Sequence, residues 1–322
     1  MDILRGEKNM ANRFDFKGTR AAAPYFEGWY VKVTDLDKNF TLALIPGVAL
    51  FGAEECFVQY NLFYKEKSLS GKITFPIEAF TTVDDPYSIL MPLFVLSETG
   101  VKAHLKDESI DLLVDLSFGT FLPLEQTLYS PSIMGPFEYL KMPCSHDVVS
   151  MQHDVKGSVV VNGEKIAINK GKGYIEKDRG STFPSKYVWA QSNIFKERED
   201  CSVFLSVADI DLNVINFMGT IAVFHDGEKE HRFATYLGAK AEVKVDVDQQ
   251  NYSVKLKDPR KRLTAQVSLK NSDKLIAPMN HNMDYTIKET VKADISLVFE
   301  EKDKEPVYLN TINGAAECVN WD

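Results

Sequence analysis

Apolar and polar residues alternate with a period of two along much of the chain. The clearest case is AEVKVDVD (residues 241–248), in which every second residue is apolar. Shorter alternating runs occupy residues 71–75, 252–256 and 294–299. Because successive side chains of a β-strand point to opposite faces, each run predicts a strand with one buried and one solvated face.

Two dipeptides that favour tight turns separate predicted strands. Asn162-Gly163 lies between SVVV and EKIAI, and Asp226-Gly227 lies between IAVF and a strand from Arg232. Both are strong signals for β-hairpins. Helical periodicity is scarce, and the best candidate helix covers only residues 122–129. The pattern predicts an all-β fold of antiparallel barrels or sandwiches with few short helices.

The length of the chain and its Pro-containing breaks bear on its domains. A chain of 322 residues suggests two domains or one large β domain. The alternating pattern is interrupted at residues 131–143 and 179–186. We place the boundary at the second break, which gives an N-terminal β domain of residues 1–184 and a C-terminal β domain of residues 185–322.

Composition and charge exclude several classes of function. The 37 basic and 46 acidic residues leave a net charge of −9, so neither nucleic acid nor an anionic membrane surface is an expected partner. The four cysteines show no spacing typical of zinc sites or disulfide frameworks, and no glycine motif for nucleotides occurs. No apolar run is long enough for a membrane span, and the first ten residues lack the pattern of a signal or transit peptide. We therefore expect a soluble, cytoplasmic protein.

Aromatic residues surround one carboxylate in the segment 24–30, PYFEGWY. On a strand, Tyr25, Glu27 and Trp29 would share one face, and Phe26 and Tyr30 the other. A carboxylate between two large aromatic rings is costly to bury unless it is hydrogen-bonded or protonated. Glu27 is therefore a candidate acid, and the alternative is an acid at a barrel rim that faces water or an arginine.

Two His-Asp pairs occur in SHDVVSMQHD, residues 145–154. Their presence invites a metal hypothesis, but an odd separation puts His146 and His153 on opposite faces of a continuous strand. Only a bulge or a turn would bring both to one ion, so we predict no metal site. We expect one histidine to face the interior for hydrogen bonding or proton transfer, and the other to lie at a rim.

A third group of polar and aromatic residues spans residues 171–193. Tyr174, Glu176 and Asp178 fall on one face of the first strand predicted there. The second strand has small residues on one face and, on the other, Tyr187, Trp189, Gln191 and Asn193. A face of large side chains with polar tips suits a pocket wall, and the alternative is an exposed charged turn at EKDRG. No sequence pattern for an activated serine or cysteine nucleophile is found.

These segments resemble the tocopherol cyclase family. The resemblance runs in family order from residue 24 to about 195, more loosely beyond, and rests on PYFEGWYVKV, LALIPG, SIMGPFEYL, HDVVSMQHDVKGSVVVNGEKI and GKGYIEKDRGSTFPSKYVWAQSNIF. The chain departs from the family in one motif, because Arg179 stands where the GYIEKDWG-like turn usually has tryptophan.

The resemblance implies two lipocalin-like antiparallel β-barrel domains with the ligand in a cavity, and distant kinship with carotenoid hydratases. It implies an enzyme that closes a chromanol ring: an acid protonates a side-chain double bond of a prenylated hydroquinone, and the phenol captures the cation. In carotenoid hydratases a Tyr-x-Asp motif is thought to supply the acid. Tyr174-Ile175-Glu176 lies where that motif would fall.

We expect Glu176 to be the acid, with Glu27 as its rival, because burial can keep a carboxyl group protonated at neutral pH. Tyr174 belongs to the same motif, and a neutral His146 could accept the phenolic proton. Aromatic faces would stabilise the cation, and no cofactor is required. The residues expected to contact the substrate are Tyr25, Trp29, Gln59, His153, Asp178, Trp189, Gln191 and Asn193.

Two other functions remain open on the same fold. The protein could be a carrier of lipids or isoprenoids, or a hydratase that adds water to an isoprenoid double bond. In each case the expected partner is a small hydrophobic ligand, a prenylated aromatic compound or an isoprenoid. We expect it to be collected through transient contact with a membrane, without a transmembrane segment.

Overall fold

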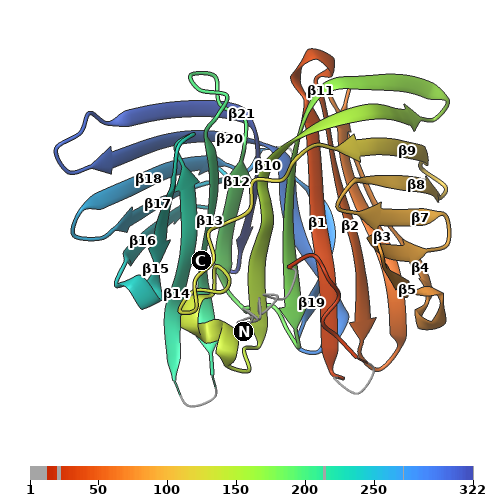
Figure 1. Ribbon diagram of the computed structural model, residues 1–322, viewed down its shortest axis with the longest axis horizontal. Coiled ribbons are helices and arrows are strands. Elements are labelled where there is room, and N and C mark those ends of the chain that lie inside the picture. The colour runs from red at the N-terminus through yellow and green to blue at the C-terminus, as the bar shows by residue number, and fades with distance from the viewer. Residues whose placement is uncertain (1–12, 20–22, 213–214, 271, 322) are drawn as a thin grey trace, which may run out of the picture.

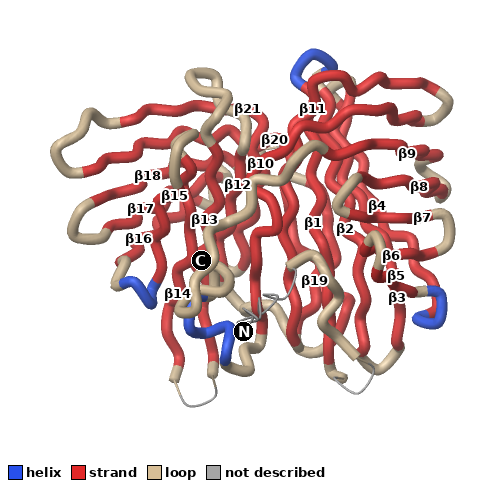
Figure 2. Tube along the Cα trace, in the orientation of Figure 1, coloured by secondary structure: helices blue, strands red, loops and turns tan. Residues whose placement is uncertain are grey.

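The computed structural model describes residues 13–19, 23–212, 215–270 and 272–321, and its regular structure is almost all β-strand (Figures 1 and 2). The first sheet is antiparallel and has 11 strands, in the order β4-β3-β2-β1-β11-β10-β9-β8-β7-β6-β5. Their bounds are β1 (Tyr25–Asp35), β2 (Phe40–Leu50), β3 (Glu54–Tyr64), β4 (Lys67–Pro76), β5 (Thr81–Asp84), β6 (Tyr87–Met91), β7 (Phe94–Ser97), β8 (Gly100–Lys106), β9 (Asp111–Phe118), β10 (Cys144–Val161) and β11 (Glu164–Gly180).

The second sheet is also antiparallel and has 10 strands, in the order β15-β14-β13-β12-β21-β20-β18-β17-β16, with β19 paired to β20 outside this path. Their bounds are β12 (Tyr187–Ser192), β13 (Ser202–Asp211), β14 (Asn216–His225), β15 (Glu230–Ala234), β16 (Lys240–Asp246), β17 (Asn251–Lys257), β18 (Lys261–Ser268), β19 (Asp273–Met279), β20 (Asn282–Glu301) and β21 (Val307–Val319).

Helices among the described residues are short 3₁₀ turns: η2 (Leu36–Lys38), η3 (Ile77–Ala79), η4 (Gly135–Tyr139) and η5 (Thr235–Leu237). The helix predicted over residues 122–129 is wrong, because this segment is irregular. The backbone of Leu122 instead exchanges hydrogen bonds with Met151 and Gln152 of β10. Tertiary pairing therefore overrides the weak local preference. No helix among the described residues is long and apolar enough to cross a membrane.

The two sheets lie side by side, with the first at the right and the second at the left of Figure 1. A cluster of apolar residues from both sheets fills the space between them, including Tyr30, Tyr174, Trp189 and Phe204. Strand β19 reaches across to the first sheet, where the Gln59 side chain exchanges two hydrogen bonds of 2.9 Å with the backbone of Ile276. The central strands of the two sheets thus form one shared interior.

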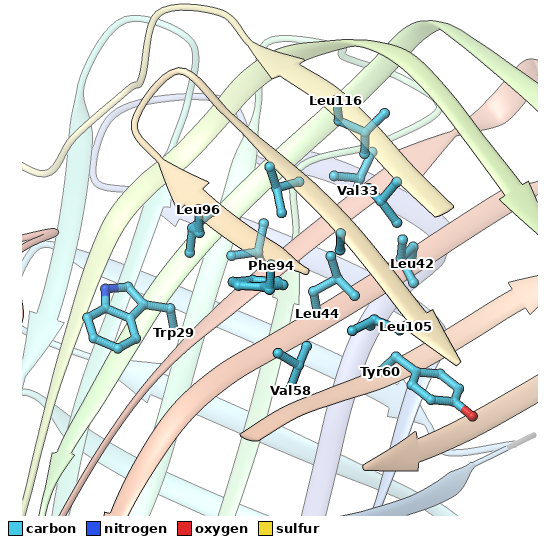
Figure 3. Packing of buried hydrophobic residues seen from close by; sticks show 14 of the residues in the cluster. Trp29, Val33, Leu42, Leu44, Val58, Tyr60, Phe94, Leu96, Leu105 and Leu116 are labelled. Carbon is cyan, nitrogen blue, oxygen red and sulfur yellow. The ribbon is translucent and has the colours of Figure 1, made fainter. Parts of the chain in front are cut away.

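Each sheet also encloses an apolar core of its own. Figure 3 shows part of the first core, which includes Trp29, Leu42 and Leu105. The second core contains Phe224 and Phe299. These two lipocalin-like antiparallel units, with few short helices, confirm the predicted fold class.

The burial of a strand follows its place in this arrangement. Strands β9 and β18, far from the contact between the sheets, alternate between buried and more exposed residues. All six residues of β12 are buried, because one face packs on the second core and the other faces the first sheet. The alternation of buried and exposed residues is therefore clear in the outer strands, and it is absent from central strands such as β12, where both faces are buried.

Both predicted hairpins are confirmed. The turn between β10 and β11 has positive φ values, 49° at Asn162 and 86° at Gly163, as the tight hairpin turn requires. Asp226-Gly227 lies in the connection between β14 and β15. The boundary predicted between residues 184 and 185 falls in the connection between β11 and β12. That the two units are separate domains stays a prediction.

Candidate active site

A cavity of about 170 Å³ lies between the two sheets. Its walls are mainly apolar and come from strands of both sheets and from the connection that joins β11 to β12. The ionisable side chains that border it include Glu27, Tyr30, His146, Glu176, Asp178, Tyr187 and Glu317. The cavity is thus an apolar space with a few placed polar groups, as is typical of a ligand site.

Glu176 of β11 is buried and is contacted through one of its two oxygens. Oε2 accepts hydrogen bonds from the Tyr174 hydroxyl at 2.6 Å and from the Trp189 indole at 3.1 Å. His146 Nε2 lies 3.5 Å from the same oxygen. Oε1 has no hydrogen-bond partner among the described residues. A proton on Glu176 would therefore be carried by Oε1.

Burial sets the acidity of this carboxyl group. Removal from water raises the pKa of Glu176 to about 7, with His146 opposing the shift and Asp178 adding to it. A carboxyl group with such a pKa is largely protonated at slightly acidic pH and can give its proton up near neutral pH. Glu176 is therefore chemically able to act as a general acid.

His146 lies close to Glu176 and Asp178, two carboxyl groups of β11. Its Nδ1 lies 2.8 Å from Asp178 Oδ1, and its ring stacks on Phe204 with centroids 4.6 Å apart. Burial opposes a charge on His146, but Asp178 and Glu176 outweigh burial and raise its pKa to about 9. The imidazole is therefore protonated at neutral pH. A protonated imidazole accepts no proton, so the raised pKa does not favour the acceptor role expected for His146.

Glu27, the rival acid, is held as an ion-paired carboxylate. Its Oε1 lies 2.7 Å from Lys177 Nζ, and it accepts hydrogen bonds from the Tyr25 hydroxyl at 2.6 Å and from the backbone of Lys17 and Gly18. Glu27 is fully buried, so the alternative of a rim acid facing water or an arginine is wrong. Glu27 borders the cavity, but both of its carboxylate oxygens already have partners within the protein. These contacts are typical of a carboxylate with a structural role.

The aromatic neighbours of Glu27 divide between the two faces of β1 as alternation predicts. Phe26 and Tyr30 border the cavity. Trp29 lies in the core of the first sheet (Figure 3). Its indole donates to the backbone oxygen of Phe14 at 2.8 Å. Tyr25 packs against that same core. Neither Tyr25 nor Trp29 is among the described residues that border the cavity, so their placement does not suit direct substrate contact.

The two histidines do not meet. The pairing of β10 with β11 shifts register twice between Val148 and His153. His153 packs its ring against Phe118 and Phe121 and contacts Ser150 at 3.0 Å. Burial lowers the pKa of His153 to about 3, so its ring is neutral. The expectation that one histidine lies at a rim is wrong, because these phenylalanines cover His153, and His146 is also mostly buried.

The remaining predicted binding residues fall into two groups. Asp178, Trp189 and Gln59 border the cavity. Gln191 and Asn193 instead form internal contacts outside it: Gln191 meets Lys32 at 3.4 Å, and Asn193 donates to the backbone of β11 at 2.7 Å. These two side chains therefore hold the sheets together.

Two carboxyl groups of the second sheet were not anticipated from the sequence. Glu317 accepts a hydrogen bond from the Tyr187 hydroxyl at 2.6 Å, and Glu289 accepts one from Tyr30. Both are buried, and they lie opposite each other on β21 and β20. A signal for Glu317 exists in the sequence, because it is the single carboxylate in the small and apolar run GAAECV, residues 314–319. Glu289 has no comparable signal.

His146 also borders a second, polar cleft of about 530 Å³. Arg13 and Asp147 form an ion pair there at 3.3 Å. Arg179, the residue that replaces the tryptophan usual in the family motif, pairs with Glu138 in the same cleft. His146 thus lies between an apolar cavity and a polar one.

His146, Glu176 and Asp178 are also the one group among the described residues whose spacing could hold a metal ion, with ligand atoms within 4.8 Å of one another. The set of one imidazole and two carboxylates suits several divalent ions. However, His146 already uses Nδ1 on Asp178 and carries a second proton at neutral pH. A metal would have to displace that proton, and we keep the prediction of a metal-free site.

Comparison with solved structures supports the fold. CghA shares 7% identity over 92% of this chain and 88% of its own, with a TM-score of 0.61. Kievitone hydratase from Nectria haematococca shares 11% identity over 97% of this chain and 95% of its own, with a TM-score of 0.54. No curated protein matches the sequence. The family model described as tocopherol cyclase-like matches residues 128–318, more than half of the chain, and the protein therefore belongs to the tocopherol cyclase-like family.

Proposed function

We propose that this protein is a tocopherol cyclase-like enzyme in which Glu176 protonates a side-chain double bond of a prenylated hydroquinone. The observation that carries this proposal is the Glu176 carboxyl group. Tyr174 and Trp189 hold its Oε2, its Oε1 has no partner among the described residues, and it borders an apolar cavity with a pKa of about 7.

The reaction needs one proton and returns it. The proton on Glu176 Oε1 adds to the less substituted alkene carbon, which leaves a tertiary cation on the neighbouring carbon. The phenolic oxygen forms a C–O bond to that carbon, and its proton returns to Glu176 Oε1. Protonated His146, 3.5 Å away, stabilises the transient Glu176 carboxylate. Tyr30 and Trp189, with ring centroids 5.3 Å apart, present aromatic surface to the cation.

The cavity volume limits what the site encloses. Pockets that enclose a drug-sized ligand usually measure roughly 300–1,000 Å³. At about 170 Å³, this cavity suits the ring and the reacting end of the side chain. The rest of a long prenyl chain would extend beyond it.

Hydration of an isoprenoid double bond is a second candidate, and one observation favours it. The polar cleft borders His146, which also borders the apolar cavity, so a water molecule could reach the cation from that side. The same acid would serve both reactions, with water replacing the phenol as the nucleophile.

Incubation with prenylated hydroquinones at pH 6–7, followed by chromatography and mass spectrometry, tests the proposal. A cyclase gives a product of unchanged mass and altered retention, a hydratase adds the mass of water, and a carrier returns the ligand unchanged. Glu176→Gln keeps the shape of the side chain without its acidic proton, so turnover should fall roughly 10²–10⁴-fold while ligand binding persists.

Glu27→Gln is the matched control, because it alters another buried glutamate that belongs to the Lys177 ion pair. Per amount of folded protein, it should leave turnover within a few-fold of wild type. If Glu27→Gln abolishes turnover and Glu176→Gln does not, the proton donor has been misassigned. If wild type converts none of the hydroquinones, the cyclase proposal fails.

A further inference from the structure

Three buried glutamates lie between the sheets, and each accepts a hydrogen bond from a tyrosine, in the pairs Tyr174–Glu176, Tyr30–Glu289 and Tyr187–Glu317. Glu289 is fully satisfied, because Tyr30 binds one oxygen and Asn61 the other at 3.0 Å, and it is not among the described residues that border the cavity. Glu317 differs from Glu289 on both counts. It borders the cavity, and only its Oε2 has a hydrogen-bond partner among the described residues.

The charges around Glu317 oppose its ionisation. Described cations compensate the other two glutamates, since His146 forms an ion pair with Glu176 and Lys32 acts on Glu289. No described cation forms an ion pair with Glu317. Among the described residues, the titratable groups with a marked electrostatic influence on Glu317, or from it, include Tyr30, Tyr187, Tyr252, Glu176, Asp178 and Glu289.

The carboxylates among these neighbours would repel an ionised Glu317, and the hydrogen bond from Tyr187 opposes this effect only in part. Burial, followed by the nearby carboxylates, raises the pKa of Glu317 well above its usual range. The hydrogen bond from Tyr187 to Oε2 then fixes the position of the proton on Oε1. Glu317 therefore presents an unpaired O–H donor at the cavity wall.

We propose that Glu317 stays protonated and donates a hydrogen bond through Oε1 to an oxygen atom of the substrate, so that the cavity selects oxygen-bearing isoprenoids over hydrocarbon ones. The inference rests on the proposed function for the identity of the cavity as the substrate site. A hydrocarbon ligand would leave the buried donor unpaired, and this is costly in a water-poor site.

Glu176 and Glu317 then have different tasks because their surroundings differ. Glu176 can lose its proton, since His146 stabilises the carboxylate that remains. Glu317 has no such cation, so it keeps its proton and serves as a fixed hydrogen-bond donor. Pairs of carboxyl groups with environments that separate their acidities commonly divide acid and binding roles in this way.

Binding of two unreactive probes tests the inference. One probe is a hydroquinone with a saturated ten-carbon side chain, and the other is benzene with the same chain. Calorimetric titration should show that wild type binds the hydroquinone roughly tenfold to hundredfold more tightly. Glu317→Gln keeps a donor and should retain most of this preference. Glu317→Met should reduce the preference to within about threefold, because it removes the donor at similar volume.

Glu289→Gln is the control, because it alters a buried carboxyl group that does not border the cavity, and it should leave the preference unchanged. Should Glu317→Met fail to fold, infrared spectroscopy of wild type and Glu317→Gln provides a second measurement. At pH 8 the carbonyl band of protonated carboxyl groups should be present in wild type and weaker in Glu317→Gln, because burial also raises the pKa of Glu289.

Several outcomes overturn the inference: Glu317→Met keeps the preference for the hydroquinone, the infrared band is absent from wild type, or wild type binds neither probe. The probes contain no double bond, so these results do not depend on turnover. A preference that requires Glu317, in a protein that converts no prenylated hydroquinone, would support the inference and reject the cyclase proposal.

Discussion

The two oxygens of the Glu176 carboxyl group meet different surroundings. Oε2 accepts from Tyr174 and Trp189 and faces the imidazolium of His146, whereas Oε1 has no partner among the described side chains. Hydrogen bonds to Oε2 stabilise the carboxylate and therefore make Glu176 a stronger acid, while burial makes it a weaker one. The balance leaves the proton on the oxygen that can deliver it.

This balance predicts how turnover depends on pH. The donor must be protonated, and the pKa of Glu176 is about 7, so turnover should fall roughly tenfold per pH unit above that value. His146 lowers the pKa of Glu176, so removal of its charge in His146→Gln should move the fall to higher pH, with a lower maximal rate. Initial rates measured between pH 5 and 9 test both statements. A fall that begins at the same or lower pH in His146→Gln would contradict the assigned coupling.

Chelation tests the prediction of a metal-free site. His146 Nδ1 lies 2.8 Å from Asp178 Oδ1, and the imidazole is protonated at neutral pH. The ring nitrogens of His146 therefore carry protons and are not free to bind a metal ion together with Glu176 and Asp178. We expect turnover and ligand binding to survive dialysis against a strong chelator. Elemental analysis before and after dialysis gives the measurement. Stoichiometric metal that is lost together with activity would show that the three side chains hold an ion.

At the scale of single elements, Gly173 marks a close approach of strand β11 to β10. A Cβ built on Gly173 would lie 2.2 Å from His153 Nε2, and Phe118 and Phe121 prevent the ring from moving aside. Gly173→Ala should therefore lower the free energy of unfolding by roughly 1–3 kcal/mol. Gly52→Ala is the matched control, because a Cβ there meets nothing within 4 Å, and it should change stability by less than about 0.5 kcal/mol. Urea unfolding measures both, and equal stabilities would refute the close approach.

The strands far from the contact between the sheets could be predicted from local sequence. Residues 252–256 alternate because one face of β17 is buried and the other is not, and Asn162-Gly163 specifies a hairpin through its own backbone preferences. The helix prediction for residues 122–129 is wrong because the conformation of this segment depends on pairing with Met151 and Gln152. The local sequence pattern carries no information on that pairing. Such pairing is set only when the sheet is assembled.

The candidate site was predictable only within single strands. Tyr174 and Glu176 lie two residues apart, so alternation alone places them on one face. Glu317 meets Tyr187, which is 130 residues earlier in the chain, and nothing in either segment encodes that encounter. Similarly, alternation places Trp29 and Tyr30 on opposite faces of β1, but it does not indicate which of these faces packs against the second sheet. That choice is made by the packing of the two sheets.

At the scale of the whole molecule, the two sheets share one interior, and this bears on the predicted domains. Separation would expose buried apolar residues such as Tyr30, Trp189 and Phe204, together with buried carboxyl groups. Fragments 1–184 and 185–322 expressed alone should therefore aggregate or unfold without cooperativity, and their co-expression should restore turnover. Size-exclusion chromatography and thermal melting test this. A monodisperse fragment with a sharp melting transition would show that the unit folds by itself.

The hydrogen bond from Trp189 to Glu176 joins the second sheet to the acid of the first. Indole emission responds to charge near the ring, and ionisation of Glu176 places a negative charge 3.1 Å from the indole nitrogen. The chain has three tryptophans, of which Trp29 lies in the first core and Trp321 packs against the second. A protein in which both are replaced by phenylalanine would keep Trp189 as its sole tryptophan, which can be excited selectively over tyrosine. Its emission would then report both the ionisation of Glu176 and the packing of the two sheets against each other.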